Sequence, residues 1–216
     1  MPHARRTITR QPPRTPQAGP RSKRDQILDV ATDYFGRYGY DETKWADVAA
    51  AVGIGSTALY HYFESKQHCL YEIMSRAVVR TRERFDHIVA ANTDWRTALV
   101  ELLESGFDLA PKDVHEYRVL LSQHERLEAR RSAPREEAAR KSVRARKREL
   151  EAAWTAFLAR GIEEGELPIS DPQLLARALL GLYNSVWTWY RPGGALSIED
   201  VGRFFVGREL ALLGCD

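Results

Sequence analysis

The sequence predicts an all-helical protein with a small N-terminal unit of three helices and a larger helical domain behind it. Apolar residues recur at the 3.6-residue spacing of a helix in almost every segment, and candidate capping residues divide the chain into about nine helices. No segment alternates between apolar and polar residues with the period of a strand. At 216 residues, of which 44% are hydrophobic and 10% aromatic, the chain can bury a sizeable core in one medium domain or two small ones.

The first 20 residues are predicted to form a basic, proline-rich arm. Arginine and lysine recur up to residue 24 without an acidic residue, and prolines interrupt any periodic pattern. This composition predicts disorder over residues 1–20. Such an arm can contact nucleic-acid phosphates or a minor groove, or serve only as a solubilising tail, and the sequence leaves both alternatives open.

The first helix is predicted to begin after Ser22 and to end at Gly39, because a serine is a good N-cap and a glycine a common stop. A second helix starts at about Thr43 and a third covers about residues 56–63. These two helices match the spacing of a DNA-binding helix-turn-helix. Gly53 supplies the turn, and Ala49 the small residue where the helices meet. The inward-facing positions are filled by Val48, Val52, Ile54, Leu59 and Tyr62.

Six longer helices are predicted beyond residue 64. Ser65 caps a fourth helix to about residue 88, and Asp94 a fifth to about 109. The remaining helices are expected over about residues 113–131, 134–164, 172–190 and 198–213. A capping box of Ser197 and Asp200 opens the last helix.

From Arg21 to Met74 the chain resembles the DNA-binding domain of the TetR/AcrR family of bacterial repressors. The first-helix motif of that family is met by Ile27, Leu28, Ala31, Phe35, Gly39 and Tyr40. The helix-turn-helix motif is met by Thr43, Asp47, Val48, Ala49, Gly53 and Ile54, and its closing part by Leu59, Tyr60, Tyr62, Phe63, Lys66 and Leu70. The resemblance implies a DNA-binding domain at residues 21–66 and a ligand-binding and dimerisation domain at residues 67–216.

The DNA contacts are predicted around the third helix, whose N-terminal end would read base edges in the major groove. The reading candidates are Gly55, Ser56, Thr57 and Ala58. The resemblance adds Tyr60, His61 and Lys66 as phosphate contacts, and Thr43 and Lys44 lie at a predicted helix N-terminus that favours a phosphate. The reading end carries no basic residue, which weakens the case for arginine- or lysine-to-guanine readout. Trp45 either covers the DNA backbone or packs within the domain.

A homodimer is predicted from the last two helices. Ala178, Gly181 and Ser185 form a row of small residues that would let another helix approach closely, and apolar residues adjoin it. The predicted interface residues are Leu175, Ala178, Leu179, Gly181, Leu182, Ser185, Val201 and Phe205. Burial inside one protomer is the alternative. In the family these helices build a four-helix bundle between two copies, and two reading helices recognise two half-sites of a palindromic operator.

An effector site is predicted among the aromatic residues of the larger domain, where the family holds an apolar cavity. The predicted ligand residues are Phe85, Leu99, Leu103, Phe107, Tyr117, Leu121, His124, Trp154, Phe157, Tyr183, Asn184 and Trp187. His124 and Asn184 are the polar members that could orient a ligand. Plain core packing is the alternative reading of the aromatic residues.

Residues 184–194 resemble the end of the eighth helix in repressors of steroid and fatty-acid catabolism, several of which respond to CoA thioesters. A strongly basic stretch precedes this segment, and its cations could receive the phosphates of CoA or simply face solvent. It comprises Arg130, Arg131, Arg135, Arg140, Lys141, Arg144, Arg146, Lys147 and Arg148.

The function predicted from these observations is a ligand-responsive, homodimeric transcriptional repressor. It binds a double-stranded DNA operator and is released by a small apolar effector of acyl-CoA or sterol-CoA type. We predict no catalytic residues, no metal site, no cofactor and no membrane association, and expect a cytoplasmic protein. Two alternatives stay open: a repressor of an efflux pump that responds to hydrophobic drugs, and a constitutive architectural DNA-binding protein.

Overall fold

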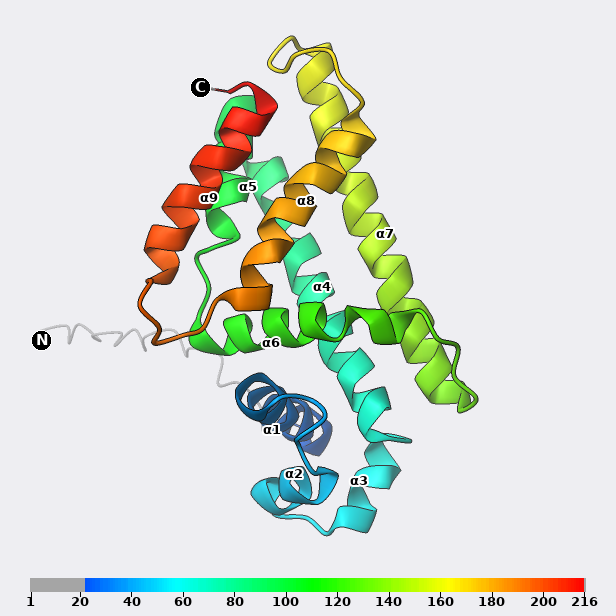
Figure 1. The fold of residues 1–216 in the computed structure, drawn as a ribbon. Coiled ribbons are helices and arrows are strands. Elements are labelled where there is room, and N and C mark those ends of the chain that lie inside the picture. Colours follow the sequence, from blue (N-terminus) through cyan, green and yellow to red (C-terminus); the bar gives the residue numbers. More distant parts are fainter. Residues whose placement is uncertain (1–21, 216) are drawn as a thin grey trace, which may run out of the picture.

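The computed structural model describes residues 22–215, and within this range the chain is helical throughout, with no strand (Figure 1). The predicted all-helical class is therefore confirmed. The predicted arm at residues 1–20 lies outside the described residues. The α-helices are α1 (Lys23–Tyr38), α2 (Trp45–Val52), α3 (Ser56–Tyr62), α4 (Lys66–Ala91), α5 (Trp95–Ser105), α6 (Pro111–Ser122), α7 (Pro134–Glu163), α8 (Pro172–Trp189) and α9 (Ile198–Leu213). One short 3₁₀ helix, η1 (His124–Leu127), follows α6.

Side-chain caps hold several helix starts where the sequence predicts them. The Ser22, Ser65 and Ser197 hydroxyls accept the backbone N–H groups of Asp25, His68 and Asp200. The Asp94 carboxylate accepts the N–H of Thr97, and Asp171 caps α8 in the same way. Each bond satisfies a donor that the helix itself leaves open.

Two predicted helix ends are wrong. The sixth helix ends at Ser122 instead of residue 131, because the chain leaves helical geometry at Gln123 (φ −115°, ψ 15°) and tightens into η1. The fifth ends at Ser105 instead of residue 109. There the Arg84 guanidinium donates to the Ser105 carbonyl (2.6 Å), which satisfies an acceptor that a longer helix would have used.

The apolar side chains gather into two clusters. The first joins α1–α3 to the beginning of α4 and includes Ile27, Leu59 and Leu70, all fully buried. The second lies among α4, α5, α7, α8 and α9 and is rich in aromatic rings. In Figure 1, α6 crosses the molecule between α1 and the helices of the second cluster.

Helix α4 belongs to both clusters. Its residues up to Val78 pack in the first cluster, and Phe85 and Ile88 pack in the second. The predicted division between residues 66 and 67 stays a prediction, but the apolar core that supports α1–α3 continues well past it. A displacement of α4 would therefore reach both ends of the molecule.

Candidate DNA-binding surface and effector site

The turn between α2 and α3 has the geometry that a helix-turn-helix requires. Gly53 has a φ of 74°, a left-handed conformation that glycine adopts readily. The N–H of Ile54 donates to the Ala49 carbonyl (3.0 Å) and closes the end of α2. Val48 and Leu59 are fully buried in the first cluster, where α2 packs against both α1 and α3. The first cluster therefore fixes the orientation of α3.

One face of α3 is exposed and carries most of the predicted DNA contacts. Ser56, Thr57, Tyr60 and His61 are all exposed, and the Tyr60 side chain is 56% accessible. Lys44 is also exposed at the N-cap of α2, where no side chain caps the helix. Open N–H groups and a lysine at that position favour an anion. Gly55 and Ala58 complete the reading end of α3.

Two other predicted DNA contacts, Thr43 and Lys66, have partners inside the domain. Thr43 is buried, and its hydroxyl donates to the carbonyls of Gly39 (2.7 Å) and Tyr34 (3.2 Å). The Lys66 ammonium donates to the Thr43 carbonyl (2.7 Å) and lies 4.3 Å from the centre of the Tyr40 ring. Burial lowers the pKa of Lys66. Direct phosphate contact by either residue stays a prediction, and these partners disfavour it.

Trp45 packs inside the DNA-binding unit. Its indole meets the Phe63 ring edge to face at 6.4 Å, and the side chain is half-buried. This contact favours the packing interpretation of Trp45 over a role as a cover for the DNA backbone.

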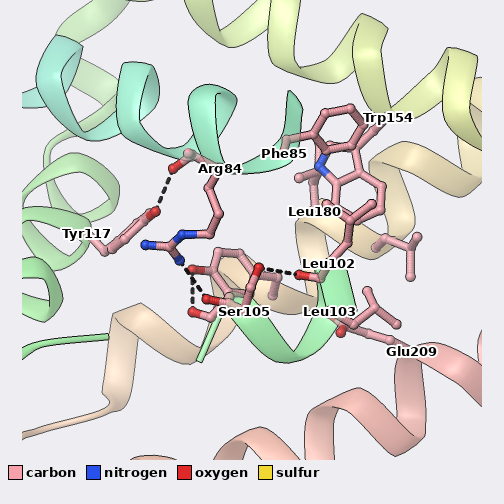
Figure 2. A pocket seen from close by; sticks show the side chains of 13 residues that line it. Arg84, Phe85, Leu102, Leu103, Ser105, Tyr117, Trp154, Leu180 and Glu209 are labelled. Carbon is pink, nitrogen blue, oxygen red and sulfur yellow. Dashed lines mark hydrogen bonds between the residues drawn. The ribbon is translucent and has the colours of Figure 1, made fainter. Parts of the chain in front are cut away.

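An apolar cavity of about 60 Å³ lies in the larger domain, among α4, α5, α7, α8 and α9 and beside α6 (Figure 2). We call it the inner cavity. It is lined by Thr81, Arg84, Phe85, Leu102, Leu103, Ser105, Gly106, Tyr117, Trp154, Leu179, Leu180, Tyr183 and Glu209. Trp154 and Phe85 form one wall, with ring centres 5.2 Å apart. Glu209 enters from the opposite side, from α9 (Figure 2).

A larger groove of about 460 Å³ adjoins the inner cavity, and we call it the outer groove. Thr81, Tyr117, Leu180 and Tyr183 line both spaces and so separate them. The hydroxyls of Thr81 and Tyr117 are hydrogen-bonded at 2.5 Å within this shared wall. The cations that line the outer groove are Arg144, Lys147, Arg148 and Arg177, and its acidic residues are Glu128 and Glu151.

The chain contains the two parts of a known family of regulators. A family described as "Bacterial regulatory proteins, tetR family" matches residues 27–73. A second, described as "Tetracyclin repressor-like, C-terminal domain", matches residues 118–213. The chain belongs to the TetR family. It is a helix-turn-helix transcription regulator, and its relatives are regulators rather than enzymes.

Individual TetR-family proteins resemble the chain over most of its length. The transcriptional repressor KstR2 of Mycolicibacterium smegmatis is 27% identical over 198 residues, covering 90% of this chain and 91% of KstR2. The structure of PfmR from Thermus thermophilus is 28% identical, with a TM-score of 0.70 over 87% of this chain and 97% of PfmR. AibR, solved in complex with isovaleryl coenzyme A and operator DNA, has a TM-score of 0.71 over 87% of this chain and 97% of AibR. At 21% identity, that likeness shows the fold alone.

Eight of the twelve predicted ligand residues line one of the two spaces of this TetR-family domain. The inner cavity is lined by Phe85, Leu103, Tyr117, Trp154 and Tyr183, and the outer groove also by Leu121, His124 and Asn184. The other four line neither space and are buried in the second cluster: Leu99, Phe107, Phe157 and Trp187. Contact with a ligand stays a prediction for the eight, and for these four their burial favours the core-packing alternative.

Sequence reasoning missed Arg84 and Glu209, the two charged residues of the inner cavity. The sequence did contain a signal for Glu209, whose side chain is only 1% exposed in the structure. It follows Gly202 and Val206 and precedes Leu213 at helical spacing, and all four are buried. A charged residue in such an inward row indicates a special environment, since an unpaired charge is costly to bury.

The predicted interface residues divide into two groups. Ala178 and Gly181 are exposed on α8, with Leu175, Leu182, Ser185 and Phe205 partly buried. Leu179 and Val201 are buried inside the protomer, which favours the alternative of burial within one protomer for these two residues. Large apolar side chains that the prediction omitted lie exposed on the same two helices: Leu174, Trp189, Phe204 and Leu212.

Three sets of contacts join the DNA-binding unit to the larger domain. At η1 the Arg126 guanidinium donates to the Asp41 carboxylate (2.6 Å). On one side α6 packs on α1, where Arg118 donates to the Gly36 carbonyl (3.2 Å). On the other side the Glu64 carboxylate accepts the N–H of Glu136 at the start of α7 (2.9 Å), and the Ser65 hydroxyl donates to the Glu136 carboxylate (2.5 Å). Residues of η1, α6 and α7 also line the outer groove, so each of these contacts connects the wall of the groove to the DNA-binding unit.

No helix in residues 22–215 is long and apolar enough to cross a membrane.

Proposed function

We propose that this TetR-family chain is a dimeric repressor that leaves its operator when an apolar CoA thioester binds. The observation that carries the proposal is an apolar cavity beside a groove lined by four cations. A CoA thioester has the same division, with an apolar acyl group at one end and phosphates at the other. Phosphates bind best to lysine and arginine, and acyl groups to apolar walls.

The acyl group would occupy the inner cavity and the phosphates would face Arg144, Lys147 and Arg148. At about 60 Å³ the inner cavity is far smaller than the roughly 300–1,000 Å³ of a typical small-molecule site. Entry of an acyl group therefore requires the shared wall to move. Breaking the Thr81–Tyr117 hydrogen bond is the smallest such movement, and it would displace α4 and α6 together.

This displacement would reach the DNA-binding unit through α1. A Cβ added to Gly36 would lie 2.7 Å from the Cβ of His115, so α1 and α6 are already as close as a glycine allows. An outward movement of α6 at Tyr117 would therefore push or release α1. A ligand releases DNA only if it binds the released conformation more tightly, and about 1–3 kcal/mol of such preference weakens operator binding roughly 5- to 150-fold.

The relatives support the effector class. KstR2 proteins are named as transcriptional repressors. The solved KstR2 of Mycobacterium tuberculosis is described as a ketosteroid transcriptional regulator. AibR was solved with a CoA thioester and operator DNA bound. A steroid-derived or branched acyl group on CoA suits both descriptions and the aromatic walls of the inner cavity.

We further propose that Ser56 and Thr57 read the operator, while Lys44, Tyr60 and His61 contact phosphates. Two copies of the chain would place two α3 helices on a palindromic site. The large apolar side chains exposed on α8 and α9 support that dimer, because a monomer seldom exposes many such side chains to water: Leu174, Trp189, Phe204 and Leu212.

The effector test is a titration of CoA thioesters against the chain bound to DNA from upstream of its own gene. Release by acyl-CoA and sterol-CoA compounds, but not by free CoA or the free acids, supports the proposal. Release by hydrophobic drugs without CoA favours the efflux-pump alternative. DNA binding that no apolar compound changes favours an architectural protein.

The dimer test is Gly181→Leu, with Ala152→Leu at an exposed position of α7 as the matched control. A Cβ at Gly181 meets no atom within 4 Å inside the protomer, so the variant should fold. We expect Gly181→Leu to sediment as a monomer and to lose operator affinity, while Ala152→Leu stays dimeric. A Gly181→Leu dimer with unchanged affinity would contradict the proposed interface.

A further inference from the structure

Glu209 is the one residue of the inner-cavity lining that presents a carboxyl group. It comes from the C-terminal half of α9 and is 1% exposed, yet it lines the cavity together with apolar side chains such as Leu103 and Trp154. Figure 2 shows its side chain on the side of the cavity that faces α9. Within residues 22–215, no hydrogen bond or ion pair satisfies this carboxyl group.

The one cation of the inner-cavity lining is engaged elsewhere. Arg84 lines the same cavity, but its guanidinium donates to the Ser105 carbonyl (2.6 Å). Tyr183 also lines the cavity, and its hydroxyl donates to the Gly106 carbonyl (3.0 Å). The Thr81 and Tyr117 hydroxyls are bonded to each other. The hydroxyl and guanidinium groups of the lining thus have partners, whereas the carboxyl group of Glu209 has none.

A buried carboxyl group without a partner is expensive, because its lone pairs and its charge lose water without compensation. Burial accordingly raises the pKa of Glu209 to about 8. The group is therefore mostly protonated at neutral pH and can donate a hydrogen bond as well as accept one. What the site lacks is a polar atom opposite the carboxyl group, inside the cavity.

The charges around the cavity indicate the kind of atom that would complete it. Arg84 on α4 would repel a cation, and the arginines and lysine of the outer groove would repel it on entry. An anion would face a carboxyl group that prefers its neutral form. A neutral oxygen avoids both costs, and a protonated carboxyl group donates to a carbonyl or hydroxyl oxygen readily.

We propose that Glu209 is a ligand-recognition residue whose carboxyl group hydrogen-bonds a carbonyl or hydroxyl oxygen on the apolar part of the effector. The proposal deepens the proposed function, because it rests on the inner cavity being the effector site. It selects oxygenated acyl groups, such as keto- or hydroxy-bearing rings and chains, over plain hydrocarbon. It also places an effector contact on α9, the helix that carries the exposed Phe204 and Leu212.

The test uses two small probes that differ in a single group. Cyclohexanone and methylenecyclohexane have nearly the same shape, but only the ketone can accept a hydrogen bond. We expect the wild-type chain to bind the ketone about 3- to 10-fold more tightly than the hydrocarbon, as one hydrogen bond allows. Bound cyclohexanone labelled with ¹³C at the carbonyl should show the downfield shift of a hydrogen-bonded ketone.

Three variants separate recognition from a structural role. Glu209→Leu should remove the preference and the carbonyl shift. Glu209→Gln keeps a donor at the same place and should retain both in part. Glu104→Leu, at an exposed position of α5 outside the lining, should leave both unchanged. Leucine is apolar and similar in size, so Glu209→Leu should remain folded in this apolar setting.

The outcomes also distinguish this inference from the proposed function. A ketone preference that survives in Glu209→Leu overturns the role of Glu209, whatever the acyl-CoA titration shows. A preference that Glu209→Leu abolishes, in a chain that no CoA thioester releases from DNA, supports Glu209 and overturns the CoA assignment. Failure of both probes to bind the wild-type chain overturns the inference, since the inner cavity would then not accept an apolar ligand.

Discussion

The two apolar clusters of the molecule differ in how completely they are filled. The first cluster is closed around α1–α3, where Ile27, Leu59 and Leu70 are fully buried and line neither the inner cavity nor the outer groove. Its far end meets the outer groove at Val78, Leu120 and Leu127. The second cluster surrounds a cavity, contains most of the ring contacts and buries Glu209 without a partner. A tightly packed unit keeps α3 in one orientation, whereas an incompletely filled one can respond to a ligand.

The largest expected effect breaks the first cluster. Leu70 on α4 is fully buried among α1 and α4 residues, so Leu70→Ala should leave a void and lower the free energy of unfolding by about 2–5 kcal/mol. Urea denaturation measures this loss, and operator binding should fall with it. A loss well below about 1 kcal/mol would mean that the DNA-binding unit is less tightly packed than the structure indicates.

The next effect concerns Glu209 in the second cluster. Its pKa is about 8 in the folded chain, against an ordinary value of 4.5. Between these values the unfolded chain has lost the proton that the folded chain keeps, so the free energy of unfolding should fall as the pH rises from about 4.5 to about 8. The shift sets an upper bound of about 5 kcal/mol, and local rearrangement should reduce the effect to about 1–3 kcal/mol.

Glu209→Gln removes this titration, so the variant should be more stable than the wild-type chain at about pH 8 and differ less at about pH 5. Thermal melts at both pH values measure the difference. Glu104→Gln, at an exposed position, serves as the control and should track the wild-type curve. If the wild-type and Glu209→Gln curves run parallel across this range, the carboxyl group is not the buried neutral acid described here.

A matched pair of enlargements sharpens the comparison. Leu70→Phe places extra volume where the first cluster has none to spare and should cost about 1–3 kcal/mol. Leu103→Phe adds the same volume at the wall of the inner cavity, where it can be accommodated, and should cost less than about 1.5 kcal/mol. Leu103→Phe should also weaken effector-induced release from DNA. Equal destabilisation by the two changes would remove the contrast between the clusters.

Local sequence signals predicted the first cluster better than the second. The spacing of Val48, Gly53 and Leu59 and the caps at Ser22 and Ser65 depend on neighbours within one or two helical turns, and the structure contains them as predicted. The helical rows of aromatic residues likewise indicated the region of the cavity, although they did not separate its lining from the core behind it.

What the sequence did not reveal depends on contacts between distant segments. Gly161 and Gly202 allow Trp95 and Phe107 to approach closely, and a Cβ at either glycine would lie within 2.8 Å of the ring-bearing side chain. Such pairs decide which side chains line the cavity, but nothing near Gly161 in the sequence points to Trp95. Lys66 turns inward for the same kind of reason: its acceptor, the Thr43 carbonyl, belongs to another element.

The smallest expected effect concerns how the two clusters communicate. Glu64 joins the DNA-binding unit to the start of α7 through one hydrogen bond to the Glu136 N–H (2.9 Å), and α7 carries Arg144 and Lys147 of the outer groove. Glu64→Ala should lower stability by only about 0.5–1.5 kcal/mol. Glu163→Ala, exposed at the far end of α7, is the control.

If the effector acts through α7, Glu64→Ala should reduce the fold-change in operator affinity that the effector causes. The affinity without effector should stay nearly unchanged. If it acts through the contact of α6 with Gly36, the fold-change should persist in Glu64→Ala. Measuring operator binding with and without effector in both variants therefore shows whether the signal depends on the contact of Glu64 with α7.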